Sequence, residues 1–187
     1  LFFLFIFFEK GKTTGFNIKE IERNESFVVS KVIFKGDDGK DIYALFFEPL
    51  KEKFDVVIVL PGAGGTKESR RHYAEILSEM GYGAFILDQR GIGETGGELA
   101  SLEQDFNAFL NKQEVFQFSM VKDVVKASDF LDSMENVNEI AVLGESMGGR
   151  NAIIAAGLDG RIKSVIVISS AGYLGSFADA RANDFLA

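Results

Sequence analysis

The chain has 187 residues, of which 47% are hydrophobic, and this size and composition are typical of one globular domain with a substantial core. The formal net charge of −8 argues against nucleic acid as a partner, because no basic surface is available to neutralise phosphates. The absence of cysteine excludes a disulfide framework, a thiolate metal site and a cysteine nucleophile. Since His72 is the single histidine, a metal centre built from several histidines of this chain is excluded as well.

The chain opens on an unbroken apolar run, Leu1 to Phe8, which stops at Glu9 and Lys10. The run is too short to cross a bilayer, which takes about 20 residues. We interpret it as the remainder of a signal peptide or of an uncleaved anchor, with a buried strand or an artefact as the alternatives. Residues 1–25 are therefore set apart as an N-terminal segment and the domain is expected over 26–187. A membrane-anchored or secreted location is favoured over a cytoplasmic one.

The pattern of strands begins after this segment. Two alternating segments, 27–34 and 42–47, flank a turn rich in glycine and aspartate and predict a β-hairpin. Beyond Pro49 the strands change to short, fully apolar runs, which are typical of strands buried on both faces. These runs are Val56 to Leu60, Ala84 to Leu87, Ile140 to Leu143 and Val165 to Ile168.

Helical periodicity separates the apolar runs. The first helix is predicted to end at Gly81, and its apolar face consists of Tyr73, Ile76, Leu77 and Met80. The face of the second consists of Met120, Val124, Ala127, Leu131 and Met134, and a third helix begins near Met147. Strands that alternate with helices imply a parallel sheet covered on both faces. The segment 91–118 has no clear period and is expected to be an excursion that lines a site.

A serine stands where a predicted buried strand turns into a predicted helix. The segment reads Gly144-Glu145-Ser146-Met147-Gly148, which is the pattern G-x-S-x-G. On such a sharp turn a serine hydroxyl can be reached by an acyl carbon, and the two glycines avoid the collisions that side chains would cause. The N–H of Met147, at the start of the helix, can bind a developing oxyanion. Ser146 is therefore the candidate nucleophile, with a purely structural turn as the alternative.

A glycine-rich turn follows the first apolar run. Pro61 is followed there by Gly62, Ala63, Gly64 and Gly65. Glycines let a backbone approach a ligand closely and donate an N–H without steric cost. We choose the N–H of Ala63 as the second oxyanion donor. The alternative is a plain turn, because turns between strands and helices favour glycine anyway.

A third polar segment follows the run 84–87 and contains Asp88, Arg90, Gly91 and Gly93. Asp88 and Arg90 are close enough in sequence to form an ion pair that braces the loop. Neither is a natural nucleophile or base for acyl transfer. We therefore expect this segment to have a structural role.

With these three segments in this order, residues 27–170 resemble the α/β-hydrolase superfamily. In that superfamily a strand ends in His-Gly before the oxyanion loop, and D-x-R-G-x-G-x-S and G-x-S-x-G follow. Two positions depart from the pattern, because Pro61 replaces the usual histidine and Thr95 the usual serine. Neither change removes a catalytic atom. The resemblance implies an α/β fold with a mostly parallel sheet, an N-terminal antiparallel hairpin and helices on both faces, and it assigns Ser146 as the nucleophile.

The resemblance places the catalytic histidine on a loop after the last strand, and the acid after the seventh or occasionally the sixth strand. His72 lies instead in the helix after the oxyanion loop, and we expect it to be a partly exposed helix residue. The run 165–168 is followed by Ser169 and Ser170, and Asp179 lies too far along the chain. We therefore expect the acid and the histidine to be absent from this chain and the domain to be C-terminally incomplete. This chain alone should then be inactive, with 165–168 as an uncovered apolar edge.

Two other classes of protein compete with this interpretation. A nucleotide-binding protein is suggested by Gly91, Gly93 and Gly96, which match G-x-G-x-x-G. The match is weak, because Asp88 to Arg90 separate it from the strand and no clear helix begins at Gly96. The second rival is a catalytically inactive, hydrolase-like binding module, which would have no need to keep Ser146 with both flanking glycines.

The sequence thus predicts a serine hydrolase that cleaves an ester, thioester or amide through an acyl-enzyme on Ser146. An acyltransferase or a peptidase with the same serine turn is the alternative within this class. No metal and no organic cofactor is expected. The expected partner is a small-molecule acyl substrate, and the run Leu1 to Phe8 could tether the protein to a membrane.

Overall fold

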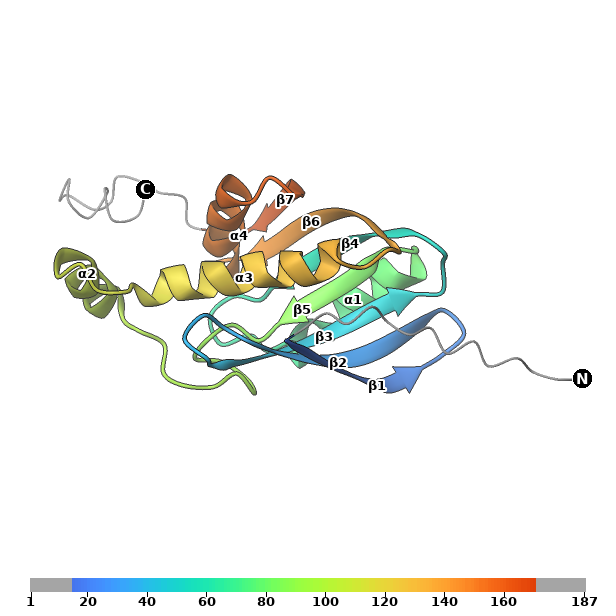
Figure 1. Ribbon diagram of the computed structural model, residues 1–187, viewed down its shortest axis with the longest axis horizontal. Helices are drawn as coiled ribbons and strands as arrows, with labels where there is room; N and C mark the ends of the chain where they lie inside the picture. Colours follow the sequence, from blue (N-terminus) through green and yellow to red (C-terminus); the bar gives the residue numbers. More distant parts are fainter. Residues whose placement is uncertain (1–14, 171–187) are drawn as a thin grey trace, which may run out of the picture.

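A computed structural model describes residues 15–170, in which seven strands form a single sheet with helices on both faces (Figure 1). The elements follow one another as β1 (Phe16–Arg23), β2 (Phe27–Lys35), β3 (Asp41–Pro49), β4 (Phe54–Leu60), the 3₁₀ helix η1 (Glu68–Arg70), α1 (Arg71–Glu79), β5 (Gly83–Leu87), α2 (Leu102–Leu110), α3 (Phe116–Asp132), β6 (Val137–Glu145), α4 (Met147–Leu158) and β7 (Ile162–Ile168). The predicted α/β architecture is confirmed, as are the hairpin formed by β2 and β3 and the four apolar runs, which form β4 to β7. Burial on both faces holds for β4 and β5, whereas the run 165–168 on β7 is exposed.

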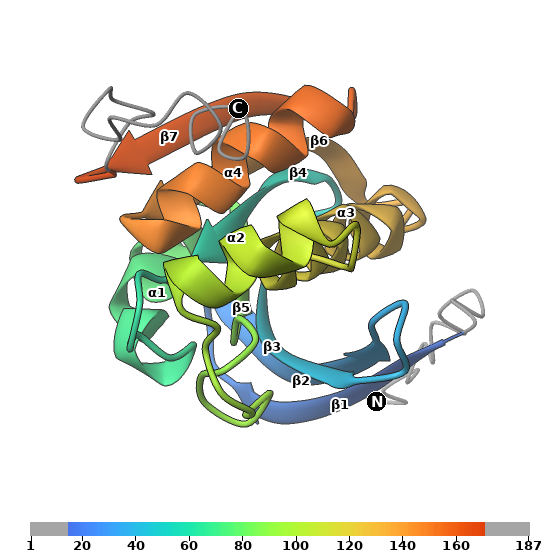
Figure 2. The ribbon, with the colours of Figure 1, turned by 90° about the vertical axis from the view of Figure 1, so that its left-hand side faces the viewer.

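The strands lie in the order β1-β2-β3-β5-β4-β6-β7. Strands β1 to β3 pair antiparallel with one another and β3 pairs antiparallel with β5, whereas β4 to β7 are parallel. The carboxyl ends of these four parallel strands therefore meet at one edge, which is where open α/β sheets bind their ligands. Figure 2 faces this edge and shows α2 in front of the sheet.

The two faces of the sheet carry separate cores. Along β4, Val56 and Ile58 face the core formed with α3 and α4, whereas Val57 and Val59 face the core formed with α1. Alternating side chains point to opposite faces of a strand, so a strand covered on both sides has to be apolar throughout. This explains why β4 and β5 read as continuous apolar runs and why they are rigid supports for the loops that follow them.

The prediction for the buried face of α1 is wrong in part. Ile76 and Met80 are 54% and 64% exposed, whereas the buried residues of the helix are Ala74 and Ser78. Small side chains let a helix backbone approach a sheet closely. Tyr73 and Leu77 of the predicted face pack beside Ala74, whereas Ile76 and Met80 lie on the outer side of the helix. Gly81 does end the helix as predicted, with a φ of +89°.

Two elements have no counterpart in the sequence prediction. Strand β1 extends the sheet into the segment before residue 26, and the ring of Phe16 packs on those of Phe34 and Phe130, with centroids 5.1 and 4.7 Å apart. Helix α2 lies in the excursion 91–118, and its first turn is held by a capping box between Ser101 and Gln104.

Strand β7 lies at the end of the described sheet. Four consecutive apolar residues on it, 165–168, are 37% to 50% exposed. Within residues 15–170 no further strand pairs with β7, so the apolar edge predicted from the sequence is present in this part of the chain.

The apolar run Leu1 to Phe8 lies outside the described residues. From residue 15 to residue 170, no helix is both long and apolar enough to cross a bilayer. The membrane tether and the location of the protein stay predictions.

Candidate active site

Ser146 stands alone between the end of β6 and the start of α4, in a backbone conformation that L-residues rarely adopt. Its φ is 51° and its ψ is −114°, and the residue is exposed. The N–H of Ser146 donates to the carbonyl of Ile168 at 2.9 Å, and the hydroxyl of Ser170 donates to the carbonyl of Ser146 at 3.0 Å. The turn is therefore held from the neighbouring strand β7. A strained conformation of this kind costs about 1–3 kcal/mol and persists only where its surroundings enforce it.

The glycines on either side of Ser146 are required by close backbone contacts. A Cβ on Gly144 would lie closer than 3.0 Å to the carbonyl oxygen of Gly148. A Cβ on Gly148 would come equally close to the carbonyl oxygens of Leu60 and Pro61. A side chain at Gly144 would therefore push the end of β6 away from α4, and one at Gly148 would push the serine turn away from the loop after β4, as the sequence pattern predicts.

The loop after β4, here called the oxyanion loop (residues 61–67), packs directly against the serine turn. A Cβ on Gly62 would be 3.3 Å from the Cβ of Ser146. Ala63 is exposed next to this contact, and the N–H of Gly65 closes the turn on the carbonyl of Gly62 at 3.0 Å. Gly64 has a φ of +80°, which favours glycine. The backbones that carry the two predicted oxyanion donors are thus brought together, and Met147 is the first residue of α4, where helical N–H groups lack an acceptor within the helix.

A line of three buried amide side chains ends on the oxyanion loop. Gln117 of α3 donates to Asn151 of α4 at 3.3 Å, and Asn151 donates to the side-chain oxygen of Gln89 at 2.6 Å. Gln89 in turn donates to the carbonyl oxygen of Pro61 at 2.5 Å. We call the three side chains of Gln117, Asn151 and Gln89 the amide relay. It could not be predicted from the sequence, because its residues come from three separate segments and none of them forms a motif within its own segment.

The predicted ion pair between Asp88 and Arg90 does not form. Asp88 is buried and instead accepts from the ammonium group and the backbone N–H of Lys67, at 2.6 and 2.7 Å. It also accepts from the N–H of Glu94 at 2.9 Å. Burial opposes the charge of Lys67, but its hydrogen bonds to Asp88, Glu68 and Glu94 raise its pKa above the usual value. Asp88 keeps a structural role, with a different partner, because it fixes the far end of the oxyanion loop.

Arg90 points away from Asp88, toward α3 and the β2–β3 turn. Its guanidinium group forms hydrogen bonds with Asp123 at 2.7 and 3.0 Å and with Asp38 at 2.5 and 3.0 Å. The hydrogen bonds from Arg90 lower the pKa of Asp38 to about 2, whereas burial raises the pKa of Asp123. One residue therefore ties the loop after β5 to two other elements.

The glycines of this third segment serve the same loop. Gly91 and Gly93 have φ values of 83° and 55°, and a Cβ on Gly93 would collide with the carboxylate of Asp88. The first helix after Gly96 is α2, which begins at Leu102, so the strand-turn-helix arrangement of a dinucleotide site is absent from this part of the described chain. Nor do residues 15–170 contain a group of three or more His, Cys, Asp or Glu side chains placed to hold a metal ion.

His72 is an exposed residue of α1, and its ring lies on that of Tyr73 with centroids 4.1 Å apart. A residue two positions before His72 does contact the serine turn. Arg70 of η1 donates to the carboxylate of Glu145 at 2.6 Å, and Glu145 immediately precedes Ser146.

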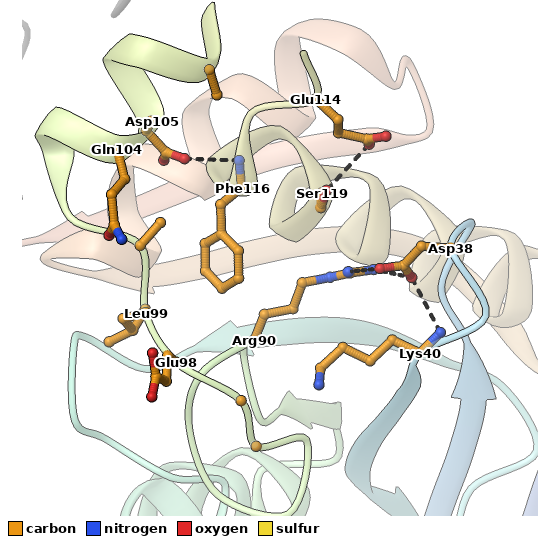
Figure 3. Close-up of a pocket in the computed structure, with 14 residues that line it drawn as sticks. Asp38, Lys40, Arg90, Glu98, Leu99, Gln104, Asp105, Glu114, Phe116 and Ser119 are labelled. Carbon is orange, nitrogen blue, oxygen red and sulfur yellow. Dashed lines mark hydrogen bonds and ion pairs between the residues drawn. The ribbon is translucent and has the colours of Figure 1, made fainter.

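A hollow of about 500 Å³ lies between α2, the start of α3 and the β2–β3 turn (Figure 3). Its lining mixes polar and apolar residues, and most of the polar side chains bond to one another or to nearby backbone. Asp38 binds Arg90, Asp105 accepts from the N–H of Phe116 at 2.9 Å, and Ser119 donates to Glu114 at 3.2 Å. Ser146 is not among the residues that line it.

Comparison with known proteins gives concordant matches. A family model described as serine aminopeptidase, S33, matches residues 51–182. Protein YtaP of Bacillus subtilis (strain 168) is 32% identical over 100 residues, which cover 52% of this chain and 33% of YtaP. An acetyl xylan esterase from Paenibacillus sp. R4 has a TM-score of 0.67 at 24% identity, with 80% of this chain and 52% of the esterase covered. A carboxyl esterase from Bacillus coagulans has a TM-score of 0.64 at 18% identity, with 79% and 46% covered.

The sheet order, the serine turn at the end of β6 and these structural matches define an α/β-hydrolase fold. The chain belongs to the hydrolase family described as serine aminopeptidase, S33, since that family's model matches more than half of it. It spans 33% of YtaP and 45% of protein YcjY of Escherichia coli (strain K12).

Proposed function

We propose that the protein is a serine hydrolase that cleaves an ester bond through an acyl-enzyme on Ser146. The observation that carries the proposal is an exposed serine held at a φ of 51° at the start of α4, with the oxyanion loop packed against it. A binding module has no physical need for a strained serine in this position.

In the proposed reaction, the Oγ of Ser146 attacks the acyl carbon while a base removes its proton. The N–H groups of Met147 and Ala63 stabilise the oxyanion, and one such donor is worth about 10²- to 10³-fold in kcat. The leaving group departs with a proton, and water then cleaves the acyl-enzyme by the same steps.

The base and the acid are proposed to come from parts of the full-length protein beyond these 187 residues. We do not assign His72 as the base, because its ring packs on Tyr73 and forms no hydrogen bond with Ser146 in the described part of the chain. The chain by itself is then expected to lack turnover, because a serine hydroxyl needs an adjacent base to attack at neutral pH.

An ester is the favoured substrate because the structures similar to this chain are named as acetyl xylan esterase and carboxyl esterase. A peptide amide is the second candidate, since the family is described as a serine aminopeptidase. Comparing an acetyl ester with an aminopeptidase substrate on the full-length protein separates the two.

The test of the mechanism is covalent labelling of the full-length protein by a fluorophosphonate probe. We expect the label on Ser146, and we expect Ser146→Ala to lose both labelling and ester hydrolysis while it remains folded. Ser164→Ala, which changes an exposed serine on β7, is the matched control and should behave as the wild type. A wild-type protein that stays unlabelled would favour the binding module instead.

A further inference from the structure

The amide relay has a fixed direction. Gln89, Asn151 and Gln117 are all buried, so each amide has to satisfy its groups within the protein. Because the oxygen of Gln89 accepts from Asn151, its nitrogen faces the carbonyl of Pro61. Asn151 cannot reverse its own amide without losing the bond that its oxygen accepts from Gln117.

The carbonyl that Gln89 binds lies at the contact between the oxyanion loop and the serine turn. The carbonyl oxygen of Pro61 is one of the atoms that a Cβ on Gly148 would strike, so it lies against the backbone two residues after Ser146. On its other side it accepts the hydrogen bond from Gln89. The carbonyl is therefore held between the side chain of Gln89 and the first turn of α4.

This bond restrains the first peptide of the oxyanion loop, which precedes a glycine. The ring of Pro61 limits its φ, but Gly62 has no Cβ and tolerates many backbone conformations. The N–H of Ala63 belongs to the next peptide, between Gly62 and Ala63, whose carbonyl accepts from the N–H of Gly65 at 3.0 Å. The hydrogen bond from Gln89 to the Pro61 carbonyl fixes the plane of the preceding peptide, so both peptides that lead to Ala63 are restrained.

We propose that Gln89, oriented by Asn151, is a positioning residue that fixes the Pro61–Gly62 peptide and, together with the hydrogen bond from Gly65 to Gly62, directs the N–H of Ala63 at the oxyanion. This inference rests on the proposed function of Ser146. Lys67 and Asp88 fix the other end of the same loop, so two consecutive residues after β5 hold both ends of the oxyanion loop.

Loss of the hydrogen bond should act on the transition state more than on substrate binding. An oxyanion forms only during the reaction, so a donor that no longer points at it lowers kcat and leaves KM nearly unchanged. We expect kcat to fall at least about tenfold, up to the roughly 10²- to 10³-fold that one oxyanion donor is worth.

The experiment compares variants of the full-length protein for ester hydrolysis and for the rate of fluorophosphonate labelling, both measured well below the unfolding temperature. Gln89→Met removes the donor at similar volume, and Gln89→Glu replaces the donor with an acceptor. Asn151→Ala leaves Gln89 in place but removes its support, together with the acceptor of Gln117, and should cause a smaller fall in the same direction. Ser128→Ala removes a buried hydrogen bond to the carbonyl of Val124, away from the relay, and is the control for a general loss of stability.

The inference is supported if kcat and the labelling rate fall in the Gln89 variants while KM stays within about twofold of the wild-type value. Ser128→Ala should keep the wild-type kcat and labelling rate. Wild-type kcat in a folded Gln89 variant overturns it, as does an equal fall in Ser128→Ala. If both Gln89 variants fail to fold, Asn151→Ala decides by the same measure. Failure of the proposed function looks different, because the wild type itself would then resist labelling.

Discussion

Two glycines of the same helix provide a direct test of how tightly the serine turn and the oxyanion loop are packed. Gly148 and Gly157 both lie in α4. Replacing glycine by alanine within a helix gains up to about 1 kcal/mol from backbone propensity. A Cβ on Gly157 has nothing within 4 Å, so Gly157→Ala should raise the free energy of unfolding by up to about that amount.

Gly148→Ala should have the opposite effect. Its Cβ would lie closer than 3.0 Å to carbonyl oxygens of Leu60 and Pro61, which belong to backbone and cannot rotate away like the end of a flexible side chain. Overpacking of this kind costs about 1–3 kcal/mol. The loop would also have to move away from Ser146, so labelling by a fluorophosphonate probe should slow at least about tenfold, as for a displaced oxyanion donor.

Urea unfolding of the full-length protein measures the first effect and the labelling rate measures the second. Gly157→Ala should label like the wild type, since it lies far along α4 from the serine. Gly148→Ala could instead be as stable as Gly157→Ala and react with the probe at the wild-type rate. That result would show that the close contact between the serine turn and the oxyanion loop affects neither the free energy of unfolding nor the reactivity of Ser146.

Two further predictions concern the charged and titratable residues near the oxyanion loop. Turnover of the full-length protein should be largely unchanged in His72→Ala, whereas a collapse of activity in the folded variant would identify His72 as the base. Because the pKa of Lys67 is raised on folding, its contribution to stability is complete below the unfolded pKa of about 10.4 and is lost only as the pH rises through the higher folded value. Urea unfolding measures the difference in the free energy of unfolding between the wild type and Lys67→Met. This difference should stay constant from about pH 6 to about pH 9 and become smaller above about pH 10.4. A difference that becomes smaller at neutral pH would contradict the raised pKa of Lys67.

The serine turn could be predicted from sequence because its determinants are local. Gly144, Ser146 and Gly148 are close neighbours, and the strand and helix on either side have strong patterns of their own. The apolar runs of β4 and β5 could be predicted equally well, because burial on both faces leaves no place for polar residues.

Side-chain partners could not be predicted in the same way, because they are set by the packing of distant segments. Asp88 pairs with Lys67, 21 positions away, and not with Arg90, two positions away. Gln89 meets Asn151 across 62 positions. Asp88 and Arg90 lie in the loop after β5, where side chains no longer alternate regularly, so sequence proximity alone is a poor guide to the ion pair.

The backbone of Ser146 has a consequence for how such a protein can be improved. At a φ of 51° glycine would be relaxed where serine is strained, so Ser146→Gly should make the folded protein more stable while it removes the reacting hydroxyl. A library of variants sorted only for resistance to heat should therefore enrich glycine at this position and eliminate the nucleophile. Selection for heat resistance and selection for activity would oppose each other at this residue, and only a screen that demands both would retain the serine.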